Sequence, residues 1–185
     1  PIHHPAVKNV MPTRQMLGIR TIFNILGPLT NPANVKYHLI GAYDINLLTP
    51  MITTLKQLGS KRAWLVHGHD GIDEISISSP TTIFELNDGM INSFEIKPSD
   101  AGLRTHALSS ILGGSPAENA RHLTALLNGE ISAYRDAVLL NSAAALLIAG
   151  LTKSLKEGVA IATHAIDSGT AKNTLELLSE STKEI

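Results

Sequence analysis

A strand, a helix and a second strand are predicted in succession between residues 37 and 67. The segments YHLIGAY at 37–43 and AWLVH at 63–67 are short apolar runs with aromatic and β-branched residues, as is typical of buried strands. Residues 47–58 between them have the apolar spacing of a helix, with Pro50 near its start. Two buried strands joined by a helix form a parallel βαβ unit. We therefore predict an α/β protein with a largely parallel sheet flanked by helices.

The rest of the chain is predicted to add one hairpin and a helical final third. Asn87-Asp88-Gly89 separates apolar runs at 82–86 and 90–96, which is a strong signal for a β-hairpin. The segment 115–118, SPAE, has the residues of a helix capping box, with proline at the first helical position. Further helices are predicted at 133–149, 155–167 and 170–179.

The predicted helix at 133–149 is apolar on nearly all sides, so it should be buried by its neighbours. Its many alanines permit close approach of the elements that pack against it. Asn141 and Ser142 interrupt the apolar run. Both should therefore find hydrogen-bond partners inside the protein.

The composition excludes several classes of function. The 185 residues carry a formal net charge of −1 and only 4% aromatic residues, so neither a basic surface nor a base-stacking platform is expected. No apolar run approaches the roughly 20 residues that span a bilayer. With no cysteine, disulfides and thiolate chemistry are excluded. We therefore expect no nucleic-acid or membrane partner.

Two adjacent acids, Asp73 and Glu74, follow the predicted strand at 63–67 and a glycine-containing turn. Adjacent carboxylates repel each other, so a fold that holds them together usually supplies a counter-charge. A hard divalent cation such as Mg²⁺ is the simplest candidate, because it takes oxygen ligands and often bridges to substrate phosphates. The alternative is a pair of solvated acids on a surface loop.

Residues 18–34 combine an apolar helical run with two proline breaks. The helical run at 21–26 is followed by Gly27-Pro28 and, four residues on, by Asn31-Pro32. Glycine followed by proline should end the helix and fix the next turn. The expected result is a rigid, irregular backbone that could form the wall of a pocket. An ordinary helix stop followed by a stiff linker is the alternative.

Two other features have weaker functional interpretations. His67 and His69 have the spacing of a metal-binding pair at a strand end, although a zinc site would need further ligands. Gly113-Gly114 precedes a helix, and helix N-termini favour anions such as phosphate. The capping box already uses part of that N-terminus, so a structural role is favoured for these glycines.

Several of these segments, in this order, resemble the anthranilate phosphoribosyltransferase family. The resemblance extends over essentially the whole chain, and its GPLTNP and DGIDE motifs are distinctive in combination. The matching segments are His4-Pro5-Ala6, Arg14, GIRTIFNILGPLTNPA at 18–33, HGHDGIDEIS at 67–76, GGSPAENA at 113–120 and RDAVLLNSAAAL at 135–146.

The resemblance implies both a reaction and a cofactor. Family members transfer the phosphoribosyl group of phosphoribosyl pyrophosphate to anthranilate, releasing pyrophosphate, in tryptophan biosynthesis. By resemblance, Asp73 and Glu74 hold the Mg²⁺ that contacts the pyrophosphate. The resemblance also implies a cytoplasmic enzyme that is a homodimer at full length.

The aromatic substrate is assigned to the beginning of the chain. By resemblance, Arg14 binds the anthranilate carboxylate, for which a planar guanidinium is well suited. His4 is assigned to the same channel, and the backbone of Gly27 and Pro28 to part of its wall. No residue is assigned a certain catalytic role.

Family members also carry, upstream, a GTGGD-type phosphate loop and a KHGN-type motif that do not occur in these 185 residues. The chain is therefore expected to be a fragment that is inactive alone. Residues 1–29 should form a helical segment that packs with an N-terminal helical domain, and residues 30–185 an α/β domain similar to that of nucleoside phosphorylases. A pyrimidine-nucleoside phosphorylase-like enzyme and a non-catalytic remnant are the alternative functions.

Overall fold

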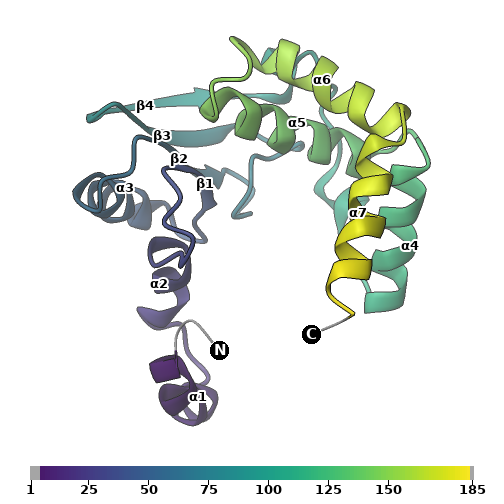
Figure 1. Ribbon diagram of the computed structural model, residues 1–185. Helices are drawn as coiled ribbons and strands as arrows, with labels where there is room; N and C mark the ends of the chain where they lie inside the picture. Colours follow the sequence, from purple (N-terminus) through teal and green to yellow (C-terminus); the bar gives the residue numbers. More distant parts are fainter. Residues whose placement is uncertain (1–4, 184–185) are drawn as a thin grey trace.

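The computed structural model describes residues 5–183, with side chains described from Lys8 onward. A four-stranded sheet in the order β1-β2-β3-β4 lies between helices (Figure 1). Its strands are β1 (Tyr37–Gly41), β2 (Arg62–Gly68), β3 (Thr81–Asn87) and β4 (Met90–Ile96). The α-helices are α1 (Pro5–Leu17), α2 (Phe23–Leu29), α3 (Leu48–Gln57), α4 (Pro116–Leu127), α5 (Ala133–Ile148), α6 (Leu155–Asp167) and α7 (Thr170–Ser181). Short 3₁₀ helices are η1 (Ile45–Leu47), η2 (Pro98–Ala101) and η3 (Leu108–Ile111).

The α/β class and the predicted βαβ unit are confirmed, but the prediction of a largely parallel sheet is wrong. Only β1 and β2 run parallel, whereas β2 with β3 and β3 with β4 are antiparallel. A parallel return usually needs a helix in the connection, and residues 69–80 contain none. The predicted hairpin joins β3 to β4 through Asp88 and Gly89, both with positive φ, as the favoured two-residue turns require.

Strand β2 is buried on both of its faces. Trp64 and Val66 pack on one side with α5, while Ala63 and Leu65 pack on the other side with α3. Successive side chains of a strand point to opposite faces, which explains why its sequence is continuously apolar. Strand β1 and the loop after β2 are therefore both attached to a rigid, buried strand.

Helices α5 and α6 lie together over one face of the sheet (Figure 1). A Cβ atom added to Gly158 of α6 would lie 2.7 Å from the Cα of Ala143 in α5, so glycine and alanine let the two backbones approach closely. The predicted burial of 133–149 is confirmed along most of the helix, including Leu140 and Ala144.

The predicted end of the second helix at Gly27-Pro28 is wrong. Helix α2 runs from Phe23 to Leu29 with Pro28 inside it. A proline so near the end removes only one N–H from the helix. Thr30 caps the end of the helix, because its hydroxyl donates to the Leu26 carbonyl at 2.8 Å and its N–H to the Gly27 carbonyl at 3.3 Å. The helix therefore stops just before Asn31-Pro32.

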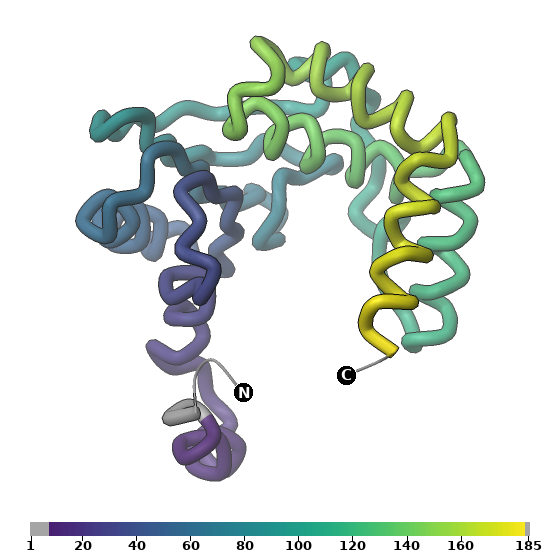
Figure 2. Tube along the Cα trace, in the orientation of Figure 1, coloured from purple at the N-terminus to yellow at the C-terminus, as the bar shows by residue number. Residues whose placement is uncertain are grey.

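The molecule is arched. The Cα trace shows α1 and α2 extending from one end of the sheet, and α4 and α7 extending to the same side from the other end (Figure 2). Ile25 and Leu29 of α2 pack against the buried cluster around α3, so α2 is anchored on the α/β part of the chain.

Candidate active site

An open groove of about 540 Å³ lies along β1 and brings together segments that are distant in the sequence. Pro28 of α2 and Asp73 of the loop after β2 both line it. The remaining lining residues are Asn31, Val35, Tyr37, His38, Leu39, Ile40 and Gly41. One of the two predicted acids and one of the predicted wall residues thus share a single hollow. β1 and β2 are parallel and end at the same edge of the sheet.

Close backbone contact fixes the position of Asp73. A Cβ atom added to Gly41, the last residue of β1, would lie 1.5 Å from the Asp73 carbonyl oxygen and 2.4 Å from its carbonyl carbon. No side chain fits into that space, so only glycine at position 41 lets the Asp73 peptide lie against the strand. The signal in the sequence is a glycine inside an apolar strand, which often marks such an approach.

The carboxylates of Asp73 and Glu74 are exposed. Within residues 5–183 the structure has no group of three or more His, Asp or Glu side chains arranged to hold a metal. Side chains of the described residues alone therefore do not complete a metal coordination shell around the acid pair. Mg²⁺ is commonly held by one or two carboxylates together with water and substrate phosphates. Two adjacent exposed carboxylates, of which Asp73 belongs to the groove lining, fit that type of donor set.

Asn141 of α5 fixes the residue that follows the acid pair. Its Oδ1 accepts the Ile75 N–H at 3.1 Å, and its Nδ2 donates to the Ile75 carbonyl at 3.0 Å. Nδ2 also donates to the carbonyl of Ala137, one turn earlier in the helix, at 3.0 Å. The expectation that Asn141 finds partners within the protein is confirmed, but the identity of those partners could not be derived from the sequence.

Serine hydroxyl groups surround the Asp70 carboxylate in the loop after β2. Asp70 Oδ2 accepts the hydroxyl of Ser76 at 2.6 Å and also that of Ser78. Burial alone would raise the pKa of Asp70, but the hydrogen bonds from Ser76 and Ser78 outweigh it and hold the pKa below its ordinary value. Gly68 leaves room for this carboxylate, because a Cβ there would lie 2.6 Å from Asp70 Oδ1. The sequence indicates only a turn at Asp70-Gly71.

Asp70→Asn is expected to destabilise the protein by about 1–3 kcal/mol at neutral pH, because hydrogen bonds to a charged acceptor are lost. Because the pKa of Asp70 is lower in the folded state, its ionised carboxylate stabilises the folded protein at pH values above the ordinary aspartate pKa of about 3.9. This stabilisation disappears as the pH falls through the lower pKa of the folded state. The difference in unfolding free energy between the two proteins should therefore shrink from about pH 6 toward about pH 3 in urea titrations.

Asp88→Asn is the matched control, because it removes an exposed carboxylate from a turn. It should leave the pH dependence of stability unchanged. If Asp70→Asn and Asp88→Asn behave alike across this pH range, the Asp70 cluster does not hold the loop.

The predicted substrate residues at the start of the chain are only partly brought together. Arg14 of α1 is half-buried and its guanidinium carbon lies 5.7 Å from the centre of the Phe23 ring. It does not line the groove. Gly27 is exposed beside Pro28, and a Cβ added to it would meet no atom within 4 Å. His4 lies outside the described residues.

His38 lines the groove but does not give it a positive charge. Burial lowers the pKa of His38, and the nearby charge of Lys36 lowers it further, against a hydrogen bond with the Val35 backbone that raises it. His38 is therefore neutral near pH 7, and its Nε2 lies 3.1 Å from the Ser60 hydroxyl. A carboxylate in this groove would need its cation from elsewhere.

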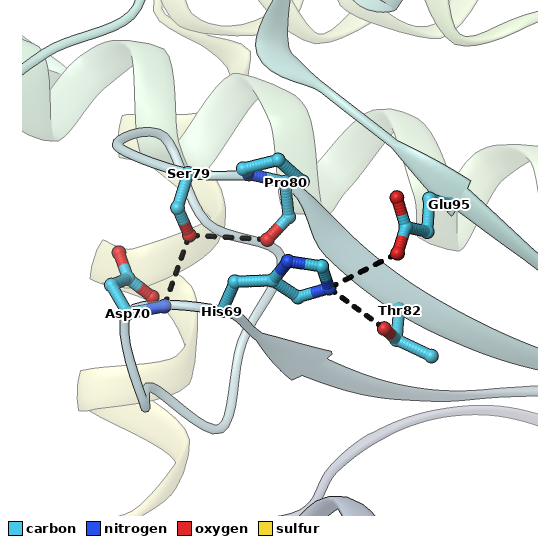
Figure 3. A network of polar contacts seen from close by, with 6 residues as sticks. All are labelled: His69, Asp70, Ser79, Pro80, Thr82 and Glu95. Carbon is cyan, nitrogen blue, oxygen red and sulfur yellow. Dashed lines mark hydrogen bonds and ion pairs between the residues drawn. The ribbon is translucent and has the colours of Figure 1, made fainter.

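The two histidines of the predicted metal-binding pair have different partners. His67 Nδ1 lies 2.7 Å from the Ala42 carbonyl oxygen. His69 Nε2 contacts the Thr82 hydroxyl at 2.9 Å and Glu95 at 3.3 Å, on strands β3 and β4 (Figure 3). The same view shows Asp70 N–H donating to the Ser79 hydroxyl at 3.1 Å. These contacts attach the loop to the sheet and do not define a zinc site.

The N-terminus of α4 is occupied by its own side chains. The predicted capping box is confirmed, with Glu118 N–H donating to the Ser115 hydroxyl at 3.3 Å and Ser115 N–H to Glu118 at 2.7 Å. The Gly114 N–H donates to Asn119 at 2.8 Å. These donors are used within the protein, which supports a structural role for Gly113-Gly114.

Comparison with known proteins shows the class of the chain. Residues 1–172 match the model of the "Glycosyl transferase family, a/b domain", and the chain belongs to that family. It is 50% identical to the anthranilate phosphoribosyltransferase of Azorhizobium caulinodans, over all of this chain and 54% of that protein. The resemblance to anthranilate phosphoribosyltransferases found in the sequence is thereby confirmed.

Solved structures agree with the sequence relatives. The anthranilate phosphoribosyltransferase of Saccharomyces cerevisiae in complex with 4-fluoroanthranilate is 30% identical, with a TM-score of 0.88, and is matched over 98% of this chain and 53% of that chain. The same yeast enzyme in complex with PRPP and Mg is 32% identical, with a TM-score of 0.87 over 98% of this chain and 53% of the other. This chain spans about half the length of the curated relatives it matches. Of the helices within residues 5–183, none is long and apolar enough to cross a membrane.

Proposed function

We propose that this chain supplies the magnesium-binding acids and part of the aromatic-acid site of an anthranilate phosphoribosyltransferase. The observation that carries the proposal is the single groove that contains both Pro28 and Asp73. The relatives named above support it, since yeast structures of that enzyme are complexes with PRPP and Mg and with 4-fluoroanthranilate. The reaction would join the phosphoribosyl group to anthranilate and release pyrophosphate, as a step in tryptophan biosynthesis.

In this reaction the bond between ribose C1 and pyrophosphate breaks, C1 bonds to the anthranilate nitrogen, and that nitrogen gives up one proton. Mg²⁺, held by Asp73 and Glu74, would supply neutralisation of the negative charge on the departing pyrophosphate. The contribution of the chain is to hold those two carboxylates in place before the substrate arrives. Electrostatic stabilisation by groups already in position usually lowers the barrier more than any other single effect.

Anthranilate is a flat aromatic acid with a weakly nucleophilic amine, so its placement matters more than a strong base. Pro28 would contribute a stiff apolar wall, continued by Gly27. Arg14 would supply the cation for the carboxylate, with His4 nearby in the same channel. Because Arg14 stacks on Phe23 and lies off the groove, this assignment requires the aromatic acid to reach from the groove toward α1.

The proposal extends to the organisation of the protein. Residues 1–29 would pack with a helical domain, and residues 30–185 would form the α/β domain of the nucleoside-phosphorylase type. A cytoplasmic homodimer is proposed for the complete enzyme.

The test is a chimaera in which this chain is joined to the part of the Azorhizobium enzyme that it does not match. We expect anthranilate-dependent release of pyrophosphate from PRPP. Arg14→Ala should raise the KM for anthranilate on the order of 100-fold, because a charged pair in a substrate site is worth a few kcal/mol, with the KM for PRPP unchanged.

Lys8→Ala is the control, since Lys8 is an exposed cation on the same helix. It should leave both KM values within twofold. Phosphate-dependent cleavage of pyrimidine nucleosides in place of transfer to anthranilate, or equal effects of the two variants, would contradict the proposed function.

A further inference from the structure

Asn141 is a polar residue on α5, beside small and apolar side chains that pack on the sheet. Its neighbours Leu140, Ala143 and Ala144 are fully buried against the sheet. Both hydrogens of its amide nitrogen are used, one on the Ala137 carbonyl of its own helix and one on the Ile75 carbonyl. The bond to Ala137 holds the side chain in one orientation, so its contact with the loop is directional.

The two bonds to Ile75 match those that a residue exchanges with a strand partner. One side chain both accepts from the Ile75 N–H and donates to the Ile75 carbonyl, as paired residues of antiparallel strands do. The Ile75 side chain is itself 1% exposed and belongs to the core cluster between sheet and α5. Position and orientation of residue 75 are therefore both fixed.

The acid pair is consequently held between two fixed points. On one side, the Asp73 peptide lies against Gly41 at the end of β1. On the other side, Ile75 is fixed by Asn141 of α5. Glu74 lies between these points, and none of the ion pairs within the described part of the chain involves either of the two exposed carboxylates. Their placement depends on the backbone.

From this arrangement we infer that Asn141 is a positioning residue for the metal-binding carboxylates of Asp73 and Glu74. The inference rests on the proposed function, because it assumes that these acids hold the metal. The side-chain hydrogen bonds of Asn141 go to the backbones of Ile75 and Ala137. Asn141 acts through the Ile75 backbone, and loss of this contact would let the carboxylates move by a distance of the kind that impairs catalysis.

The test uses Asn141→Asp and Asn141→Ala in the chimaera. Asparagine and aspartate have nearly the same shape, but aspartate keeps the acceptor for the Ile75 N–H and loses both donors. We expect the Mg²⁺ concentration for half-maximal activity, and the dissociation constant for Mn²⁺ measured by electron paramagnetic resonance with PRPP present, to rise about tenfold for either variant. The KM for anthranilate should change less than twofold.

Ser142→Ala is the matched control, because Ser142 is the next residue on the same helix and is also half-buried. It should leave the metal affinity unchanged. Amide hydrogen exchange gives a readout that needs no activity: the Ile75 N–H of the unaltered protein should exchange as slowly as β2 amides, and roughly tenfold or more faster in Asn141→Ala. Rapid exchange of Ile75 in the unaltered protein would overturn the inference even if both variants fail to fold.

The acid variants described in the Discussion separate this inference from the proposed function. If Asp73→Asn with Glu74→Gln changes the metal dependence and the Asn141 variants lose only stability, Asn141 is merely structural and the inference fails alone. If the acid variants leave the metal dependence unchanged, the proposed function and this inference are both overturned.

Discussion

Asp73→Asn combined with Glu74→Gln is expected to lower turnover of the chimaera by a factor of about 10²–10³ at submillimolar Mg²⁺, the size of effect seen when a preorganised electrostatic group is removed. The substitutions keep size and remove charge, and both side chains are exposed. Unfolding free energy should therefore change by less than about 0.5 kcal/mol, as for most surface substitutions. Steady-state rates over a Mg²⁺ series, together with urea titrations, measure both effects.

Glu176→Gln with Glu180→Gln is the control for charge, because it removes two exposed acids from α7. Its Mg²⁺ dependence should equal that of the unaltered chimaera. The assignment of the acid pair is refuted if both double variants show the same Mg²⁺ curve.

Gly41→Ala is expected to lower stability and to displace Asp73 from its place beside β1. The new methyl group would collide with the Asp73 carbonyl, so either β1 or the Asp73 peptide must shift. Overpacking of this kind costs about 1–3 kcal/mol of stability. The displacement of Asp73 should also raise the Mg²⁺ requirement about tenfold, since small misplacements of reacting groups are costly.

Leu126→Ala is the control that separates a loss of stability from a change in the Mg²⁺ requirement. Leu126 is buried in the cluster of α4, α5 and α6, away from the acid loop, and its truncation should cost about 2–5 kcal/mol. Stability should fall while the Mg²⁺ requirement stays the same. A Gly41→Ala protein that loses stability with no change in Mg²⁺ requirement would show that Asp73 does not need its observed place.

The local pattern of the sequence predicts most elements but not the direction of β3 relative to β2. The apolar runs, the Asp88-Gly89 turn and the capping box each have a short-range physical cause, and all three are present in the structure. One βαβ unit predicts a parallel pair of strands and does not determine how the following hairpin pairs with it. The direction of β3 follows from the helix-free connection at 69–80, whose path depends on contacts such as those of Asp70.

The end of α2 shows a similar limit. Gly27-Pro28 has the chemistry of a helix stop, yet hydrogen bonds from Thr30 and packing of Leu29 on the α3 cluster carry the helix past it. Tertiary contacts thus outweigh the local signal.

The acid pair of the candidate site can be selected from the sequence, whereas the contacts that hold it in place cannot. Asp73 and Glu74 stand out because two adjacent carboxylates repel each other and usually need a counter-charge. Gly41 is visible in the sequence only as a glycine within a strand, and Asn141 only as an amide within an apolar helix. Their partners, Asp73 and Ile75, depend on what the fold brings against them. Arg14 is assigned by resemblance alone, and whether it reaches the aromatic acid stays a prediction.

Anomalous diffraction from crystals of the chimaera grown with Mn²⁺ and PRPP would test the central claim most directly. We predict one strong manganese peak within coordinating distance of the Asp73 and Glu74 carboxylates, at the mouth of the groove that Pro28 lines. A manganese site ligated by other residues, with these two carboxylates turned to solvent, would contradict the account.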